Sequence, residues 1–206
     1  MSLLPPAYTR DAAEYDIRTA AFAHYRRLIV DELPLRRGDT VIDAGCGTGL
    51  CFELLQERIG PDGVLVGVDA APDMLQLAAE RVAEAGWSNV VLRCASLSDA
   101  ELPQADHALF CAVHDVLQSA SALDNILAHL RPGAAVAAGG GKWGPVWAIG
   151  LNAGVLALHA PYVRDFTGFD RPWGRLAEHL AGLRVREVAM GTGFVASGRT
   201  AQPAPP

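Results

Sequence analysis

The sequence has 206 residues, enough for one domain with a substantial core and too few for two. Half of the residues are hydrophobic and 19% are charged, a composition that excludes a disordered chain. Seventeen basic and 23 acidic residues give a net charge of −6, with no basic run, which argues against a nucleic-acid partner because phosphate binding needs clustered positive charge.

The cysteines and apolar segments predict a reducing compartment. Cys46, Cys51, Cys94 and Cys111 form no C-x-x-C pair, so neither zinc nor disulfides are indicated. The beginning of the chain lacks the basic and apolar regions of a secretory signal. The longest apolar stretch, 147–160, is too short for a membrane span. We therefore expect a cytoplasmic protein.

The first half of the chain predicts alternating helices and strands. Apolar residues at helical spacing over 12–33 predict a helical lid within 1–37. Short β-branched or apolar runs predict strands, and amphipathic segments ending at glycine predict helices. In chain order we expect a strand at 39–45, a helix at 50–60, a strand at 63–69, a helix at 72–86 and a strand at 89–94.

The second half continues this pattern and then departs from it. We expect a strand at 106–113, a helix at 121–133 closed by Pro132 and Gly133, and a strand at 134–140. Residues 142–182 hold three of the four tryptophans and no clear strand, so we expect a helical insertion there. A hairpin over 183–200 and a disordered Pro-rich tail over 201–206 complete the chain.

These elements predict one α/β domain with three layers. Near-continuous apolar strands that alternate with helices are typical of a doubly wound, mostly parallel sheet with helices on both faces. The C-terminal hairpin adds an antiparallel strand. Residues 38–141 form the expected cofactor-binding core.

A glycine-rich turn follows the first strand, in the sequence "VIDAGCGTGL" over 41–50. Glycines there let a ligand approach the backbone closely, at the edge of the sheet where α/β proteins bind ligands. The dinucleotide pattern G-x-G-x-x-G would need a glycine at position 50, where this chain has Leu50. The pattern here is instead G-x-G-x-G, formed by Gly45, Gly47 and Gly49 and preceded by Asp43.

This pattern resembles the first motif of the class I, Rossmann-like S-adenosylmethionine-dependent methyltransferases. The resemblance covers roughly 40–140 and implies that Asp43 binds near the methionine ammonium. Asp69, 20 residues after Gly49, is placed for the ribose hydroxyls. "VDAAPDML" is similar to a family stretch in which Met74 would cover the adenine. "LRPG" over 130–133 is similar to the family's turn before the next strand. The implied cofactor contacts are Asp43, Gly45, Cys46, Gly47, Gly49, Asp69, Ala70, Met74, Ser96, Leu97, Cys111 and Tyr15.

The loop after the third strand departs from the family, which usually has an acidic residue facing the adenine amino group. This chain reads "CASLSDAELP". We favour Ser96 and Leu97 at the adenine, with Asp99 as the alternative if the register differs.

His114 is the candidate catalytic residue, because the exit of the fourth strand lies beside the sulfonium in this family. It would act as a base or position the substrate, and an equally good alternative is that His114 or Asp115 caps the next turn or hydrogen-bonds the backbone. Of the other histidines, His107 is expected to be structural, and those on predicted helices, including His159, are expected at the surface or in packing. The expected substrate contacts are His114, Trp143, Tyr162 and Arg164, with Lys142 a further option for an anionic group.

The sequence thus predicts a methyltransferase that acts on a small-molecule acceptor, as a monomer or homodimer. Asp124 and Asn125 are too remote from the cofactor mouth for a metal site, so no metal is expected. Two alternatives stay open: a non-catalytic methyltransferase-like protein that binds or dimerises, and, less favoured because of Leu50, a nicotinamide-dependent oxidoreductase.

Overall fold

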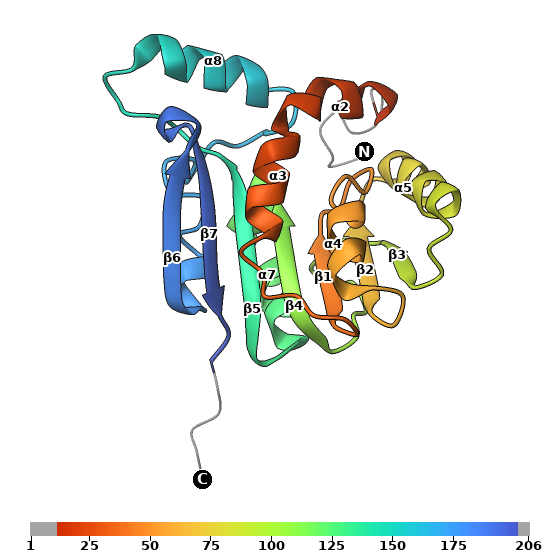
Figure 1. Ribbon diagram of the computed structural model, residues 1–206. Coiled ribbons are helices and arrows are strands. Elements are labelled where there is room, and N and C mark those ends of the chain that lie inside the picture. Colours follow the sequence, from red (N-terminus) through yellow and green to blue (C-terminus); the bar gives the residue numbers. More distant parts are fainter. Residues whose placement is uncertain (1–11, 202–206) are drawn as a thin grey trace.

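The computed structural model describes residues 12–201, which form a seven-stranded sheet in the order β3-β2-β1-β4-β5-β7-β6 (Figure 1). The strands are β1 (Thr40–Ala44), β2 (Val64–Asp69), β3 (Val90–Cys94), β4 (Ala105–Cys111), β5 (Leu130–Gly141), β6 (Ala181–Val188) and β7 (Gly193–Arg199). The helices are α2 (Ala12–Thr19), α3 (Ala23–Val30), α4 (Phe52–Ile59), α5 (Pro72–Ala85), α6 (His114–Gln118), α7 (Ala120–Ala128) and α8 (Ile149–His159), with short 3-10 turns η1 (Ala20–Phe22), η2 (Leu176–Glu178) and η3 (Ala189–Gly191).

The sheet topology confirms the predicted fold class. The first five strands pair in parallel, whereas β7 pairs antiparallel with both β5 and β6. The order of the strands reverses at β1, which lies between β2 and β4. In open α/β sheets this reversal leaves a crevice at the carboxyl ends of the strands. Both α2 and α8 lie beyond those ends (Figure 1).

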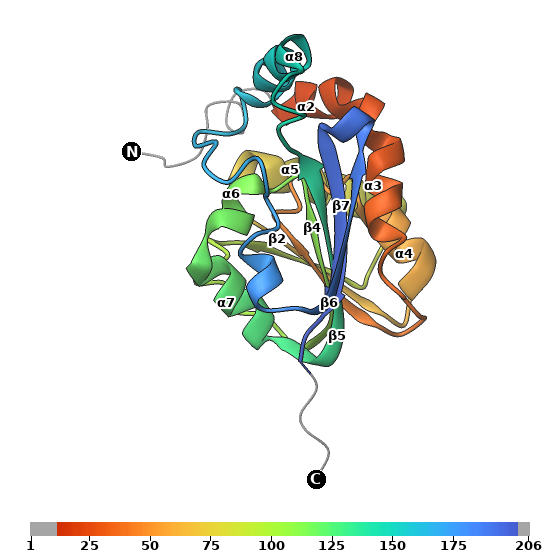
Figure 2. The same cartoon turned by 90° about the vertical axis from the view of Figure 1, so that its left-hand side faces the viewer.

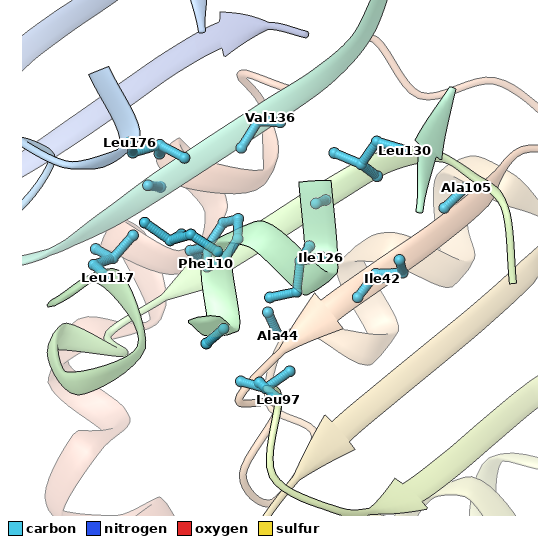
Figure 3. Close-up of a cluster of buried hydrophobic side chains, with 14 of the residues drawn as sticks. Ile42, Ala44, Leu97, Ala105, Phe110, Leu117, Ile126, Leu130, Val136 and Leu176 are labelled. Atoms are coloured by element: carbon cyan, nitrogen blue, oxygen red, sulfur yellow. The ribbon is translucent and has the colours of Figure 1, made fainter. Parts of the chain in front are cut away.

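Helices cover both faces of the sheet (Figure 2). On one face, apolar residues of α3, α4 and α5 pack on the strands, and on the other face those of α6 and α7 do so. Ile42, Phe110 and Val136 are buried on the second face, together with Ile126 from α7 (Figure 3). Each such side chain contributes roughly 1.5–3 kcal/mol by leaving water. Burial on both faces explains why the parallel strands read as nearly continuous apolar runs.

Three boundaries differ from the sequence-based expectation. The N-terminal helical region is two helices, α2 and α3, separated by η1. β5 begins at Leu130, so the "LRPG" segment belongs to the strand. The pairing of β4 with β5 shifts register between Ala105 and His107. Gly133, within the segment, has a positive φ. A bulge of this kind accommodates the missing N–H of Pro132 within a strand. The third difference is in the 142–182 segment, where α8 and η2 are the helical parts within a mostly irregular path.

The hairpin prediction is confirmed, although β6 begins at Ala181 rather than at 183. Residues 1–11 of the expected lid and residues 202–206 of the expected tail lie outside the described residues. Within 12–201, every helix is too short or too polar to cross a lipid bilayer.

Candidate active site

The glycine turn joins β1 to α4 and gives each of its glycines a positive φ. A Cβ at Gly47 would meet no atom within 4 Å, so this glycine leaves room for a ligand. A Cβ at Gly45 would come within 2.5 Å of Val113, and one at Gly49 within 2.7 Å of Phe52. The turn therefore uses two of its glycines for close packing and one for access, all in a backbone conformation that glycine adopts without strain.

Asp43 lies beside this turn as a buried carboxyl group. Its side chain is 1% exposed, and Oδ2 has no hydrogen-bond partner among the described residues. Burial raises the pKa of Asp43 to about 7, and the negative charge of Asp69 adds to this effect. An orphaned, buried carboxyl next to a second carboxyl is a site where a cationic group would be strongly favoured.

Asp69 at the end of β2 holds the turn and faces the cavity. Its Oδ2 accepts a hydrogen bond from the backbone N–H of Gly47 at 2.8 Å, and its Oδ1 accepts one from Ala71 at 2.9 Å. Burial raises the pKa of Asp69, whereas these backbone N–H groups oppose the increase. Because each carboxylate oxygen accepts more than one hydrogen bond, Asp69 keeps acceptor capacity for a ligand hydroxyl.

A cavity of about 920 Å³ opens at the carboxyl ends of β1, β2 and β4. Its size falls at the upper end of the range for ligand pockets. It brings together most of the predicted site residues: Tyr15, Asp43, Gly45, Cys46, Gly47, Asp69, Ala70, Met74, Ser96, Leu97, Cys111, His114 and Tyr162. Gly49, Trp143 and Arg164 are not among its lining residues.

Beyond β2 and β3 the cavity is bordered by the apolar side chain of Met74 and by a loop that hydrogen bonds hold in place. Met74 is fully buried and packs with Tyr15. Ser96 and Leu97 line the cavity, whereas the alternative, Asp99, does not. The amide nitrogen of Asn125 donates hydrogen bonds to the carbonyl oxygen of Leu97 at 2.8 Å and to that of Ala100 at 3.0 Å, which fixes this loop.

The N-terminal helix α2 is tied to the glycine turn by a network that sequence reasoning missed. Thr48 Oγ1 donates a hydrogen bond to Asp16 at 2.6 Å, and Arg81 forms an ion pair with the same carboxylate at 2.6 Å. Arg81 also donates to the Thr48 carbonyl at 3.0 Å. Asp16 and Arg81 are 65 positions apart in the sequence, so no local pattern predicts that they meet. This network holds Tyr15, whose ring contacts that of Tyr162 edge-on at 5.6 Å, over the cavity.

The opposite side of the cavity carries His114, at the first position of α6. It is 8% exposed, and neither ring nitrogen makes a hydrogen bond among the described residues. The start of α6 has no side-chain cap hydrogen bond, so the capping alternative is not supported. Ala112, two residues earlier, has a φ of 59°, an unusual conformation for a non-glycine residue that redirects the chain at this point.

The 142–182 segment places its polar residues differently from expectation. Lys142 is buried; its Nζ donates hydrogen bonds to the carbonyl oxygens of Trp143 and Gly191 and pairs with Glu187 at 3.1 Å, so it anchors this segment to β6. Trp143 stacks on Phe166 with a ring separation of 5.2 Å. His159 packs against Phe169, as expected for a histidine on a helix, and it also lines the cavity.

Other predicted residues have structural positions. His107 contacts Asp39 at 3.0 Å, as expected for a structural histidine. All four cysteines are free thiols. Within 12–201, no cluster of three or more potential metal ligands occurs.

Comparisons with known proteins agree with this arrangement. Residues 41–133 match a family model described as a methyltransferase domain. An arsenite methyltransferase from Halobacterium salinarum is 38% identical over 105 residues, which is 48% of this chain and 26% of that protein. An aklanonic acid methyltransferase from Streptomyces is 33% identical over 98 residues, covering 47% of this chain and 43% of that protein. The chain therefore aligns with less than half of each of these relatives.

The fold similarity extends over nearly the whole chain. The crystal structure of a SAM-dependent methyltransferase from Aquifex aeolicus superposes with a TM-score of 0.65 at 21% identity, covering 92% of this chain and 97% of the other. At that identity the likeness concerns the fold. Residues 41–133 thus match a methyltransferase domain, and the strand order and fold similarity show that the described chain has the class I, Rossmann-like methyltransferase fold, whose usual cofactor is S-adenosylmethionine.

Proposed function

We propose that this protein transfers a methyl group from S-adenosylmethionine to a small-molecule acceptor. The observation that carries the proposal is the buried Asp43, whose Oδ2 has no partner among the described residues and whose charged form burial disfavours. The methionine part of the methyl donor carries an ammonium group, and a cation beside Asp43 would restore its charged form and complete its hydrogen bonding.

The rest of the cavity fits the remaining parts of the donor. Gly47 leaves space at the turn, Asp69 offers acceptor oxygens for ribose hydroxyls, and Met74 offers an apolar surface for a purine ring. Ser96 and Leu97 would contact the base from the loop that Asn125 fixes. When bound, S-adenosylmethionine supplies an electrophilic methyl group, and the residues of this chain orient it and exclude water.

The acceptor would enter from the side formed by α2, α3 and the 142–182 segment. We assign contacts with it to His114 and Tyr162, both of which line the cavity, and retain Trp143 and Arg164 as outer contacts. The names of the relatives point to small acceptors, arsenite in one case and aklanonic acid in another. We also propose that the 1–37 region acts as a lid and that the protein works in the cytoplasm, with no nucleic-acid partner, as a monomer or homodimer.

Calorimetry with S-adenosylhomocysteine, the product of methyl donation, tests the proposal. We expect one molecule to bind per chain and NAD not to bind. Asp43→Asn removes the negative charge that would meet the ammonium, and should weaken binding at least tenfold, since charge-assisted hydrogen bonds contribute about 1.5–3 kcal/mol. Transfer of a labelled methyl group to candidate acceptors then establishes catalysis.

Asp62→Asn is the matched control, because it removes the same charge from an exposed loop. It should leave S-adenosylhomocysteine binding unchanged. A folded wild-type protein that fails to bind S-adenosylhomocysteine, or that binds NAD instead, would contradict the proposal. Donor binding without methyl transfer to any acceptor would favour the non-catalytic alternative.

A further inference from the structure

A second histidine, His159, faces the same cavity from the end of α8. Its ring lies against the backbone of Gly141, where a Cβ would overlap Nε2, and its centroid lies 5.2 Å from that of Phe169. The absence of a side chain at Gly141 is what admits the imidazole. His159 is only partly buried, so its ring borders both the protein and the open cavity.

Hydrogen bonding fixes which nitrogen of His159 carries the proton. Nδ1 lies 2.9 Å from the carbonyl oxygen of Val155, and because a carbonyl oxygen only accepts, Nδ1 donates. In the neutral ring Nε2 then holds a lone pair. Within the described residues Nε2 makes no hydrogen bond, so its basic nitrogen is available to a molecule in the cavity.

His114 packs against the same phenylalanine and lies near His159. Its ring centroid is 4.9 Å from that of Phe169, and both of its nitrogens are buried without a partner among the described residues. A buried imidazole in this state favours a ligand that satisfies it. Phe169 thus holds two imidazoles at one end of the cavity, one with a defined acceptor nitrogen and one with both nitrogens unpaired.

Burial favours the neutral form of both rings. Burial lowers the pKa of His159, and the proximity of His114 lowers it further. Burial also lowers the pKa of His114, although the negative charge of Asp115 and the nearby backbone groups of Thr167 and Asp165 oppose this. Arg164 in turn offsets part of the charge of Asp115. At neutral pH both imidazoles can therefore accept a proton.

The walls next to the histidines are apolar. Leu151, Val155 and Leu158 of α8 line this part of the cavity, and Val163 follows them in the chain. The two arginines that line the cavity, Arg18 and Arg26, belong to α2 and α3. An acceptor held here would have an apolar body and a weakly acidic proton next to the imidazoles, since a carboxylate or thiolate acceptor would need no base.

We propose, building on the proposed methyltransferase function, that His159 is the general base for an acceptor whose phenolic or enolic hydroxyl is attached to an apolar body, with His114 holding the hydroxyl oxygen. The O–H bond breaks as its proton passes to Nε2 of His159. An electron pair of the oxygen forms the new C–O bond with the methyl carbon, while the C–S bond breaks and leaves its electron pair on sulfur. The imidazolium then releases its proton to water.

The first test is nuclear magnetic resonance of the wild-type protein with S-adenosylhomocysteine bound and 1-naphthol as the acceptor probe. We expect the His159 signals to show a proton on Nδ1 and none on Nε2, and to titrate below the ordinary histidine pKa. Addition of 1-naphthol should shift the signals of both His159 and His114. A proton on Nε2, or no response of either ring to 1-naphthol, overturns the assignment.

The second test is transfer of a labelled methyl group to 1-naphthol. His159→Gln should keep S-adenosylhomocysteine binding but lose about 10²-fold or more in kcat, as expected for loss of a general base. Its remaining activity should rise with pH as the naphthol itself ionises, whereas wild-type activity levels off above the pKa of His159. His114→Asn should raise the KM for 1-naphthol more than it lowers kcat.

His179→Gln is the control, because this histidine is exposed. It should behave as wild type in each measurement. A His159→Gln variant with wild-type activity and pH profile, or equally fast methylation of 1-naphthoic acid, would rule out the base. If the wild-type protein does not bind S-adenosylhomocysteine, the result contradicts the proposed function instead. Failure of the base assignment and failure of the proposed function are therefore distinguishable.

Discussion

A buried carboxyl oxygen without a hydrogen-bond partner costs the folded state free energy, and Oδ2 of Asp43 is such an atom among the described residues. Such groups persist where function requires them, and strongly shifted pKa values are typical of functional sites. The pKa of Asp43, raised to about 7, therefore links the binding site to the stability of the protein.

The pH dependence of unfolding should report this carboxyl. Because the folded state raises the pKa of Asp43, it binds the proton more tightly than the unfolded chain between about pH 4 and pH 7. The stabilisation that comes from this tighter proton binding is thus present in acid and is lost as the pH rises to 7. At about 1.4 kcal/mol per pKa unit, we expect the loss to be about 2–4 kcal/mol.

Urea unfolding of wild type and Asp43→Asn at pH 5 and pH 8 measures the difference. The decrease in unfolding free energy from pH 5 to pH 8 should be smaller in Asp43→Asn by that amount, whereas Asp62→Asn should match wild type. Identical pH dependence in wild type and Asp43→Asn would show that Asp43 keeps an ordinary pKa.

The sequence predicted the cavity residues at the ends of the strands better than those from the 142–182 segment, for a physical reason. Asp43 and Asp69 end neighbouring parallel strands, so the sheet itself brings them together. His159 reaches the cavity through the irregular path before α8, and this helix is apolar on all sides, so its residues show no periodicity that reveals the face toward the cavity. The network of Asp16, Thr48 and Arg81 also has no local signal in the sequence, because its members come from separate elements.

At the scale of elements, α3 and β5 pack so closely that one glycine is required between them. A Cβ at Gly139 would overlap the side chain of Ile29 and lie 2.9 Å from the carbonyl oxygen of Phe194. At the next residue, Gly140, a Cβ would have its nearest contact at 3.4 Å, with Ala112. Adjacent strand residues face opposite sides of the sheet, which explains the contrast.

Gly139→Ala and Gly140→Ala form a matched pair. We expect Gly139→Ala to destabilise the protein by about 1–3 kcal/mol, since overpacking forces neighbouring groups to move. Gly140→Ala should change stability by less than about 1 kcal/mol. Chemical denaturation of the two variants measures both values, and equal stability would mean that Ile29 moves aside freely.

Element boundaries were predictable where periodicity and glycine or proline signals agreed, as for β2 and α5. They were not predictable at 130–133, where proline and glycine indicate a turn. Pairing of Leu130 with Ala105 extends the strand across these residues, and this long-range contact has no local signal.

At the scale of the whole molecule, the cavity is bounded by parts of the chain that are distant in sequence. The glycine turn, α2, the loop after β4 and α8 all contribute to its lining. A ligand at this position therefore links the N-terminal helices, the sheet and the 142–182 segment. At 100 times its Kd, any ligand that binds only the folded state stabilises it by about 2.7 kcal/mol.

Amide hydrogen exchange should show where that stabilisation occurs. With saturating S-adenosylhomocysteine, we expect slower exchange in the glycine turn, in α2 and at residues 96–98, all near the cavity. Exchange in β6, at the far edge of the sheet, should not change locally. Equal slowing throughout, including β6, would indicate global stabilisation without a defined site.

The antiparallel pair β6 and β7 at the end of the chain places β6 at an edge of the sheet. β6 lies at one edge of the sheet and β3 at the other, and an unpaired edge can recruit strands from other chains. Arg184 and Arg186 lie on β6, and each has a guanidinium nitrogen 3.6 Å from a carboxylate oxygen of Glu32. Their charges make addition of a further strand unfavourable, so the same hairpin that completes the fold guards it against edge-to-edge aggregation.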